Sequence, residues 1–182
     1  GVALTVLEKN EALRDEVFAA AFRRLQASEP EALRRARCQS MAGVAGVVLD
    51  LGAGAGSALR CDEVQRRAAH VTRWLAVEPN VHFHDAIRQV AADHGVPFPV
   101  EVLDDSAEAL AHVQDASVDV LVATHVMCTV DNVPHSLQEI ARVLKPGGKY
   151  FFFEHVLAHN GTTRRCVDAH LSRRTTCRRQ SE

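Results

Sequence analysis

The sequence contains no long apolar run. The longest runs, such as residues 118–122 and 150–153, are far shorter than the roughly 20 apolar residues that a membrane-spanning helix requires. The first residues also lack a basic stretch followed by an apolar segment and a small-residue cleavage site, so we expect no secretory signal. These two absences predict a cytoplasmic protein without a membrane span.

Cysteine pairs with metal-binding or redox spacing are absent. The chain has five cysteines, an odd number, and none of them belongs to a Cys-x-x-Cys pair. We therefore expect reduced thiols, as in an intracellular protein, at Cys38, Cys61, Cys128, Cys166 and Cys177. The spacings of His82 with His84 and of Cys166 with His170 do not match a metal site, so we assign no metal.

An excess of charge of one sign is absent as well. The formal net charge of −2 predicts no general attraction to nucleic acid, and we expect no nucleic acid partner. The local exception is the segment 157–182, in which six arginines stand against Asp168 and Glu182. We interpret this segment as a poorly ordered basic tail; phosphate binding is a weaker alternative, because no aromatic residues alternate with the arginines.

The composition, 47% hydrophobic over 182 residues, is typical of one globular domain. We divide the chain into an N-terminal helical segment (1–45), a core (46–156) and the basic tail (157–182). Within residues 4–26, helical spacing of apolar side chains predicts an amphipathic helix with its stripe at Leu13, Val17, Ala21 and Leu25, widened by Phe18 and Phe22. This helix either covers a face of the core or forms a lid over a substrate site.

The rest of the chain is organised around residues 47–56, in which an apolar strand runs into Gly52, Gly54 and Gly56. Glycine at these positions accepts positive φ and lets a ligand approach the backbone closely. A dinucleotide fingerprint would require a third glycine at position 57, where this chain has Ser57. The loop is therefore a candidate ligand site, and a plain tight connection is the alternative.

Strand-like and helix-like segments alternate through the core. Strands are predicted at residues 47–51, 71–77, 100–103, 118–123 and 149–155, and helices at 57–70, after Asn80, at 104–113 and from Pro134. Ser28 and Glu31 have capping-box spacing for a further short helix, and residues 146–148 predict a turn. This alternation predicts a doubly wound α/β domain with a mainly parallel five-stranded sheet in the order 3-2-1-4-5.

Polar residues follow each predicted strand, where ligands bind in such sheets. Glu78 ends the second strand, and its two carboxylate oxygens can accept hydrogen bonds from both hydroxyls of a ribose. Ser106 and Ala107 follow the third strand and can meet an adenine edge, or Ser106 is only a helix cap. Thr124 with His125 and Glu154 with His155 follow the fourth and fifth strands.

Five sequence stretches together resemble the class I S-adenosylmethionine-dependent methyltransferases. They are Val-Val-Leu-Asp-Leu-Gly-Ala-Gly-Ala-Gly, Val-Glu-Pro-Asn, Ser-Ala-Glu-Ala-Leu, Ser-Val-Asp-Val-Leu-Val-Ala-Thr-His and Glu-Ile-Ala-Arg-Val-Leu-Lys-Pro-Gly-Gly. The segments around Cys128 and Glu154 are similar to methyltransferase-like proteins of the type 11 group that methylate alkyl thiols. The resemblance implies S-adenosyl-L-methionine as cofactor, bound by Asp50, Gly52, Gly54, Gly56, Glu78, Pro79, Asn80, Ser106, Ala107, Thr124 and His125.

The implied reaction is transfer of a methyl group to a small-molecule acceptor, with a thiol favoured. A thiol needs little help from a base because its pKa lies near 8.5, whereas an oxygen or nitrogen acceptor needs more. His125 and His155 are our candidate catalytic bases. The alternative for each is an imidazole at a strand end that bonds to a backbone carbonyl.

The chain departs from this family in two ways. Many members carry aspartate where this chain has Ser106, and members continue past the fifth strand with a helix and two more strands, which we expect to be missing here. The fifth strand would then leave an exposed edge, covered by the tail or by a second copy in a homodimer, or left open in a shortened product. A degenerate domain that binds cofactor or a partner without turnover is one competing function, and a nicotinamide oxidoreductase, disfavoured by Ser57, is the other.

Overall fold

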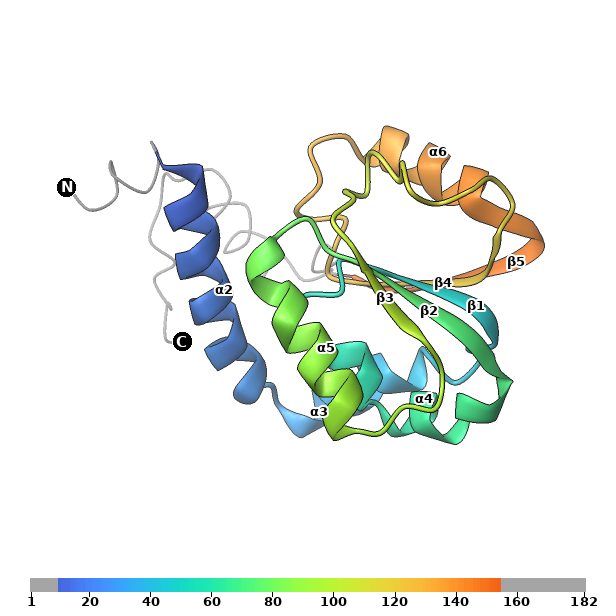
Figure 1. The fold of residues 1–182 in the computed structure, drawn as a ribbon, viewed down its shortest axis with the longest axis horizontal. Helices are drawn as coiled ribbons and strands as arrows, with labels where there is room; N and C mark the ends of the chain where they lie inside the picture. The colour runs from blue at the N-terminus through green and yellow to red at the C-terminus, as the bar shows by residue number, and fades with distance from the viewer. Residues whose placement is uncertain (1–9, 155–182) are drawn as a thin grey trace, which may run out of the picture.

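The computed structural model describes residues 10–154, in which five strands form one sheet with helices on both faces (Figure 1). The strands are β1 (Gly46–Leu51), β2 (Val71–Val77), β3 (Val100–Leu103), β4 (Val118–Thr124) and β5 (Leu144–Phe153). The α-helices are α2 (Glu11–Ala27), α3 (Glu31–Gln39), α4 (Asp62–Arg66), α5 (His84–Asp93) and α6 (Val133–Val143). Short 3₁₀ turns lie at η1 (Ser57–Arg60), η2 (Ala68–His70) and η3 (Val81–Phe83).

The sheet order is β3-β2-β1-β4-β5 with every neighbouring pair parallel, which confirms the predicted fold. β1 lies at the centre, where Leu49 pairs with Leu75 of β2 and with Leu121 of β4. The strand order reverses between β1 and β4, because β2 and β3 follow β1 on one side and β4 and β5 lie on the other, so the crevice beyond the carboxyl ends of β1 and β4 is the expected ligand site of such a sheet.

Alternate side chains of the strands pack into two separate cores. Val48, Trp74 and Val122 belong to the core that faces α3, α4 and α5. Their sequence neighbours Leu49, Leu75 and Leu121 point to the other face and belong to the core that faces α6 and the segment after β3. Burial on both faces explains why these strands are continuously apolar in sequence.

Helix α2 does not pack on either face of the sheet but stands beside α5 (Figure 1). It begins at Glu11 because the Asn10 side chain caps it, accepting a hydrogen bond from the Leu13 N–H at 3.1 Å. Its inward face matches the predicted stripe only in part, since Phe22 turns inward but Val17, Ala21 and Leu25 are exposed. The other side chains that turn inward include Asp15, Ala19 and Gln26. The prediction was wrong at the three exposed positions because this helix faces the end of the sheet rather than an apolar core.

Three local predictions also differ from the structure. The Ser28 hydroxyl donates to the Leu25 carbonyl at the end of α2, and Pro30 precedes α3 without a capping side chain, so no capping box forms. Residues 104–113 form turns rather than a helix, because the Asp105 carboxylate accepts from the His112 N–H and binds its ring, closing a loop. Residues 146–148, predicted as a turn that ends the preceding helix, lie inside β5, where the pairing with β4 shifts register.

The cysteine prediction is wrong for one pair. Cys38 at the end of α3 and Cys61 before α4 form a disulfide, with both residues buried in the core that faces these helices. The fold brings together two cysteines 23 residues apart, a spacing that carries no signal in the sequence. Cys128 is an exposed free thiol, and Cys166 and Cys177 lie outside the described residues.

Within residues 10–154, β3 and β5 form the two edges of the sheet, and Phe152 of β5 is 61% exposed. The homodimer through this edge therefore stays a prediction, and the predicted basic tail lies outside the described residues. No helix within this part of the chain is both long enough and apolar enough to cross a membrane.

Candidate functional site

A cavity of about 770 Å³ lies at the carboxyl ends of β1, β2 and β4, with α2 and α3 forming its remaining walls. Every predicted cofactor-binding residue except Gly56 lines it. Gly56 instead packs against α5: an added Cβ would lie 3.3 Å from the Ile87 Cα, and its φ is +75°. The fold thus brings the strand-end residues together, while the third glycine serves the packing of the adjacent helix.

The glycine loop is held by main-chain contacts to its neighbours. The Ala53 N–H donates to the Val77 carbonyl of β2 at 3.0 Å. Gly52 has φ +64°, and an added Cβ would lie 2.7 Å from a methyl group of Val126 in the loop after β4. A side chain at position 52 would therefore meet both backbone strain and a packed neighbour.

Glu78 connects the glycine loop to the segment after β2. Its Oε2 accepts a hydrogen bond from the Gly54 N–H at 2.8 Å, and its Oε1 accepts one from the Asn80 N–H at 2.9 Å. Burial raises the pKa of this carboxyl group, and the two N–H donors offset that rise in part. Each carboxylate oxygen keeps a further lone pair, so Glu78 can still accept hydrogen bonds from a ligand.

Asp50 is the deepest acidic group of the cavity, only 4% exposed. Burial raises the pKa of its carboxyl group to about 7, while the nearby Trp74 indole and the charge of Arg37 favour the ionised form. Neither the Asp50 Oδ2 nor the Trp74 Nε1 has a hydrogen-bond partner among the described residues. A buried carboxylate oxygen without a partner is costly, and a cationic or hydrogen-bond-donating ligand in the cavity would satisfy it.

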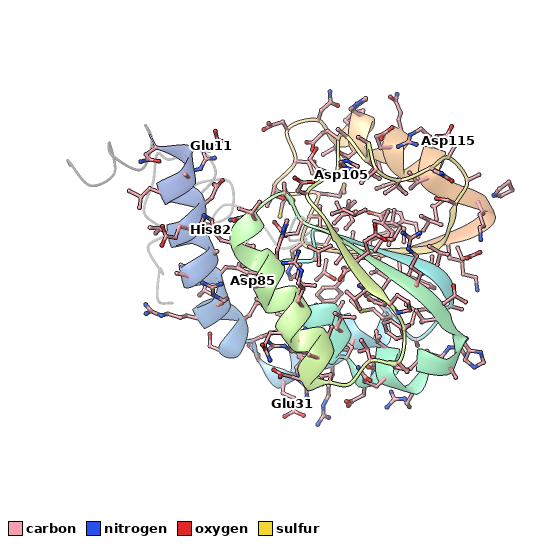
Figure 2. The ribbon with its side chains drawn as sticks, viewed as in Figure 1. Glu11, Glu31, His82, Asp85, Asp105 and Asp115 are labelled. Atoms are coloured by element: carbon pink, nitrogen blue, oxygen red, sulfur yellow. A yellow bond between two sulfur atoms is a disulfide. The ribbon has the colours of Figure 1, made fainter. Side chains whose placement is uncertain are left out.

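Asn80 ties the cavity to α2. Its side-chain Nδ2 donates to the Asp15 carbonyl of α2 at 2.9 Å, while its Oδ1 accepts from the His82 N–H at 3.0 Å. Arg23 of α2 donates to the His82 carbonyl at 3.1 Å, and Figure 2 shows His82 between α2 and α5. Pro79 lies between Glu78 and Asn80 and also lines the cavity.

The loop after β4 forms the wall opposite Glu78. His125 has φ +56°, its N–H donates to the Phe153 carbonyl at 2.9 Å, and its ring lies 5.4 Å from that of Phe153. Glu154 accepts hydrogen bonds from the N–H groups of Val126 and Met127, which fixes this loop. Thr124 and His125 both line the cavity, whereas His155 lies outside the described residues.

The cavity includes residues that we did not predict as part of the site. Phe18 and Phe22 of α2, predicted only as members of the apolar stripe, stack at 5.6 Å, and both contact the ring of Phe83. Glu29 and Arg37 come from the turn before α3 and from α3 itself. No local sequence pattern marks Glu29 and Arg37, because they reach the site only through contacts between distant segments.

Asp104, Asp105 and His112 place three ligand-type atoms within 4.8 Å of one another. The His112 Nδ1 lies 2.7 Å from an Asp105 carboxylate oxygen, which raises the pKa of the imidazole. Asp105 lies at the end of β3 (Figure 2), and the pair closes the turn that replaces the expected helix. The contacts within the cluster thus have a structural role.

The parallel sheet, the glycine loop after its central strand and the acid after the next strand define an α/β protein built to bind a nucleotide-type ligand. A family model described as "Methyltransferase domain" matches residues 49–152, more than half of the chain. The chain belongs to this family.

Relatives with established names are methyltransferases of several kinds. Human thiol S-methyltransferase TMT1A is 38% identical over 91 residues, which are 50% of this chain and 37% of that protein. The ubiquinone/menaquinone biosynthesis C-methyltransferase UbiE of Brucella anthropi is 34% identical over 107 residues, 58% of this chain and 39% of the relative. The chain therefore spans little more than a third of the length of these relatives.

Solved structures share the fold. A SAM-dependent methyltransferase from Aquifex aeolicus superposes with a TM-score of 0.63 at 18% identity, covering 79% of this chain and 76% of that one. The [4+2]-cyclase SpnF superposes with a TM-score of 0.58 at 22% identity, covering 71% of this chain and 47% of that one. One architecture thus serves more than one reaction, so the function has to be argued from the site.

Proposed function

We propose that this chain binds S-adenosyl-L-methionine and transfers its methyl group to a small-molecule acceptor, preferably a thiol. The observation that carries the proposal is the pair of hydrogen bonds from Gly54 and Asn80 to Glu78, which joins the glycine loop to the segment after β2. This pair places a carboxylate with spare lone pairs beside a loop of close-approach backbone.

The residues of the cavity fit this cofactor at both of its ends. Glu78 would accept hydrogen bonds from the ribose hydroxyls, and Asn80, Ser106 and Ala107 would border the adenine. Asp50, whose Oδ2 has no partner among the described residues, would accept a hydrogen bond from the cofactor's ammonium group. The cavity of about 770 Å³ leaves room for an acceptor as well, since small-molecule sites commonly measure roughly 300–1,000 Å³.

When bound, the cofactor would supply a methyl group on a positively charged sulfur. The chain's own contribution is to position the acceptor and exclude water, because charge is neutralised during such a transfer. Apolar side chains from α2 and from the loop after β4, among them Phe18, Phe22 and Val126, would form the dry wall. His125 lines the cavity and would take a proton from an oxygen or nitrogen acceptor, whereas a thiol would need little such help.

The preference for a thiol rests on the likeness to the human thiol S-methyltransferase. The competing proposal is a domain that binds cofactor or a partner without turnover, and a shared fold does not decide between the two. Product formation separates the two.

The first experiment is calorimetric titration of the 182-residue chain with S-adenosylhomocysteine, with NADH as the control ligand. We expect a dissociation constant near the micromolar range, which corresponds to roughly −8 kcal/mol, and no heat with NADH. Mass spectrometry would then follow methyl transfer to an alkyl thiol, an amine and a phenol. A folded chain that gives no heat with S-adenosylhomocysteine would refute the proposal, and binding without any methylated product would favour the domain without turnover.

The role of His125 is tested in the same assay. Replacement by glutamine should leave thiol methylation nearly unchanged and slow methylation of a phenol or an amine. Equal turnover of all acceptors by wild type and variant would remove His125 as a catalytic base.

A further inference from the structure

Two arginines line the cavity, and they differ in burial. The Arg14 side chain on α2 is 54% exposed and pairs with Glu11 and Asp15 at the surface. The Arg37 side chain on α3 is 6% exposed and lies beside the glycine loop. A buried guanidinium is costly unless each of its donors is used, so Arg37 needs an explanation.

The hydrogen bonds of Arg37 leave one corner of the guanidinium weakly satisfied. Its Nε and Nη2 donate to the two carboxylate oxygens of Glu29 at 3.1 and 2.9 Å. Its Nη1 makes only long contacts, 3.5 Å to the Ser57 carbonyl and 3.6 Å to the Cys61 sulfur. A neutral carbonyl at that distance and a sulfur are poor acceptors for a charged donor.

The weakly bonded Nη1 lies on the same side of the cavity as Asp50. Ser57 directly follows the glycine loop, and the positive charge of Arg37 acts on the Asp50 carboxyl group. The cavity therefore presents a buried cation and a buried acid beside one loop, and both keep hydrogen-bonding capacity. This arrangement matches a zwitterion, in which an ammonium and a carboxylate sit on one carbon atom.

We propose that Arg37 binds the α-carboxylate at the amino-acid end of the cofactor through its Nη1, while Asp50 binds the ammonium group of the same end. The inference rests on the proposed function, because it names the residue that binds the amino-acid end of the same ligand. A carboxylate oxygen would replace the two long contacts of Nη1 with a charge-assisted hydrogen bond.

Glu29 and the disulfide are positioning groups for Arg37. Glu29 holds two of the three guanidinium nitrogens, which leaves Nη1 as the corner that can donate to a ligand. The Cys38–Cys61 disulfide links the residue after Arg37 to the turn before α4, so that α3 cannot move away from the glycine loop. The guanidinium is thereby fixed before ligand binds.

The test compares two ligands that differ only in the carboxylate. They are S-adenosylhomocysteine and its decarboxylated analogue, titrated calorimetrically into wild type, Arg37→Gln and the matched control Arg14→Gln. We expect wild type to prefer S-adenosylhomocysteine by about 10- to 100-fold, the range for hydrogen bonds to charged groups. Arg37→Gln should lose most of this preference while binding the decarboxylated analogue as wild type does, and Arg14→Gln should keep the preference.

If Arg37 had only a structural role, Arg37→Gln would lower the affinity for both ligands equally, and that result would overturn the proposal. A wild-type chain that binds both ligands equally well would overturn it too, without any variant. Should Arg37→Gln unfold, as thermal melting would reveal, Arg37→Lys keeps the charge but lacks the Nη1 donor and should retain only part of the preference; an unchanged preference in this variant would overturn the assignment to Nη1.

5′-Methylthioadenosine, which lacks the whole amino-acid end, distinguishes the two proposals. Binding of this nucleoside with no preference for the carboxylate would remove Arg37 from the site and leave cofactor binding intact. Failure of all three ligands to bind folded wild type would refute the proposed function, and this inference with it.

Discussion

The two walls of the cavity are built in opposite ways. At the strand ends, Asp50 and Glu78 are buried, and Glu78 is fixed by two main-chain donors. Among the α2 residues whose burial the structure describes, only Ala19 is fully buried, while Phe18 and Leu25 are 52% and 67% exposed. The strand-end wall is held by the sheet, whereas the α2 wall rests on a few aromatic contacts and side-chain hydrogen bonds.

This difference separates two tasks. A wall fixed by main-chain hydrogen bonds costs little ordering entropy when ligand binds, which suits recognition of an invariant cofactor. A helix with few buried contacts opens at low free energy, which suits entry of ligands. Residues of α2 such as Phe18 and Phe22 line the cavity, and the lid role of this helix stays a prediction.

The largest effect should follow from removing Glu78. Glu78→Ala leaves the Gly54 N–H without its partner and removes the proposed ribose contact, so we expect at least about 100-fold weaker binding of S-adenosylhomocysteine and roughly 2 kcal/mol lower free energy of unfolding. Calorimetry and urea unfolding measure the two quantities. Glu101→Ala, which removes an exposed carboxylate of β3, is the control and should change neither.

The next effect is a pH dependence of stability that originates at Asp50. Its carboxyl group has a pKa of about 7 in the folded chain, against an ordinary value of 3.8, because burial outweighs the Trp74 indole and Arg37, and the charge of Glu78 adds to the rise. The folded state therefore holds an extra proton between these two values, and its contribution makes stability fall as pH rises from about 4 to 7.

Urea unfolding of wild type and Asp50→Asn across this range isolates that contribution. The free energy of unfolding of the variant minus that of wild type should increase by about 2–4 kcal/mol as pH rises from 4 to 8, because asparagine does not titrate. A difference between the two proteins that stays constant with pH would show that Asp50 titrates normally.

The disulfide supports the strand-end wall from behind, through α3. Its loop of 23 residues predicts a loss of about 3 kcal/mol in the free energy of unfolding for the double variant Cys38→Ser/Cys61→Ser. Reducing wild type with dithiothreitol should have the same effect and leave the double variant unchanged. Cys128→Ser, at an exposed free thiol, is the control and should stay within about 0.5 kcal/mol of wild type.

Sequence patterns predicted the strand-end wall better than the α2 wall, for a physical reason. Strands buried on both faces read as apolar runs, and the positions of the glycine loop and Glu78 follow directly from where those strands end. The inward face of α2 is set by Phe83 and the mouth of a cavity, which contains polar groups, so the apolar stripe was right at Phe22 but wrong at Val17, Ala21 and Leu25. Arg37 and the Cys38–Cys61 pair depend on contacts between distant segments, and no local pattern records those.

The smallest effect should come from the α2 wall itself. Phe22→Ala removes ring contacts with Phe18 and Phe83 at 5.6 and 5.7 Å, but the site is only half-buried, so we expect a loss of about 1 kcal/mol in stability. Affinity for S-adenosylhomocysteine should change by less than about threefold, since the strand-end wall remains intact.

Hydrogen exchange is the decisive measurement for this variant. The amides of α2 should exchange faster in Phe22→Ala while those of β1 and β2 keep their protection, because the helix then opens without the sheet. Leu25→Ala, at an exposed position on the same helix, is the matched control and should leave exchange unchanged. Equal loss of protection in α2 and the sheet would mean that the two walls unfold as one unit, which would contradict the division of tasks between them.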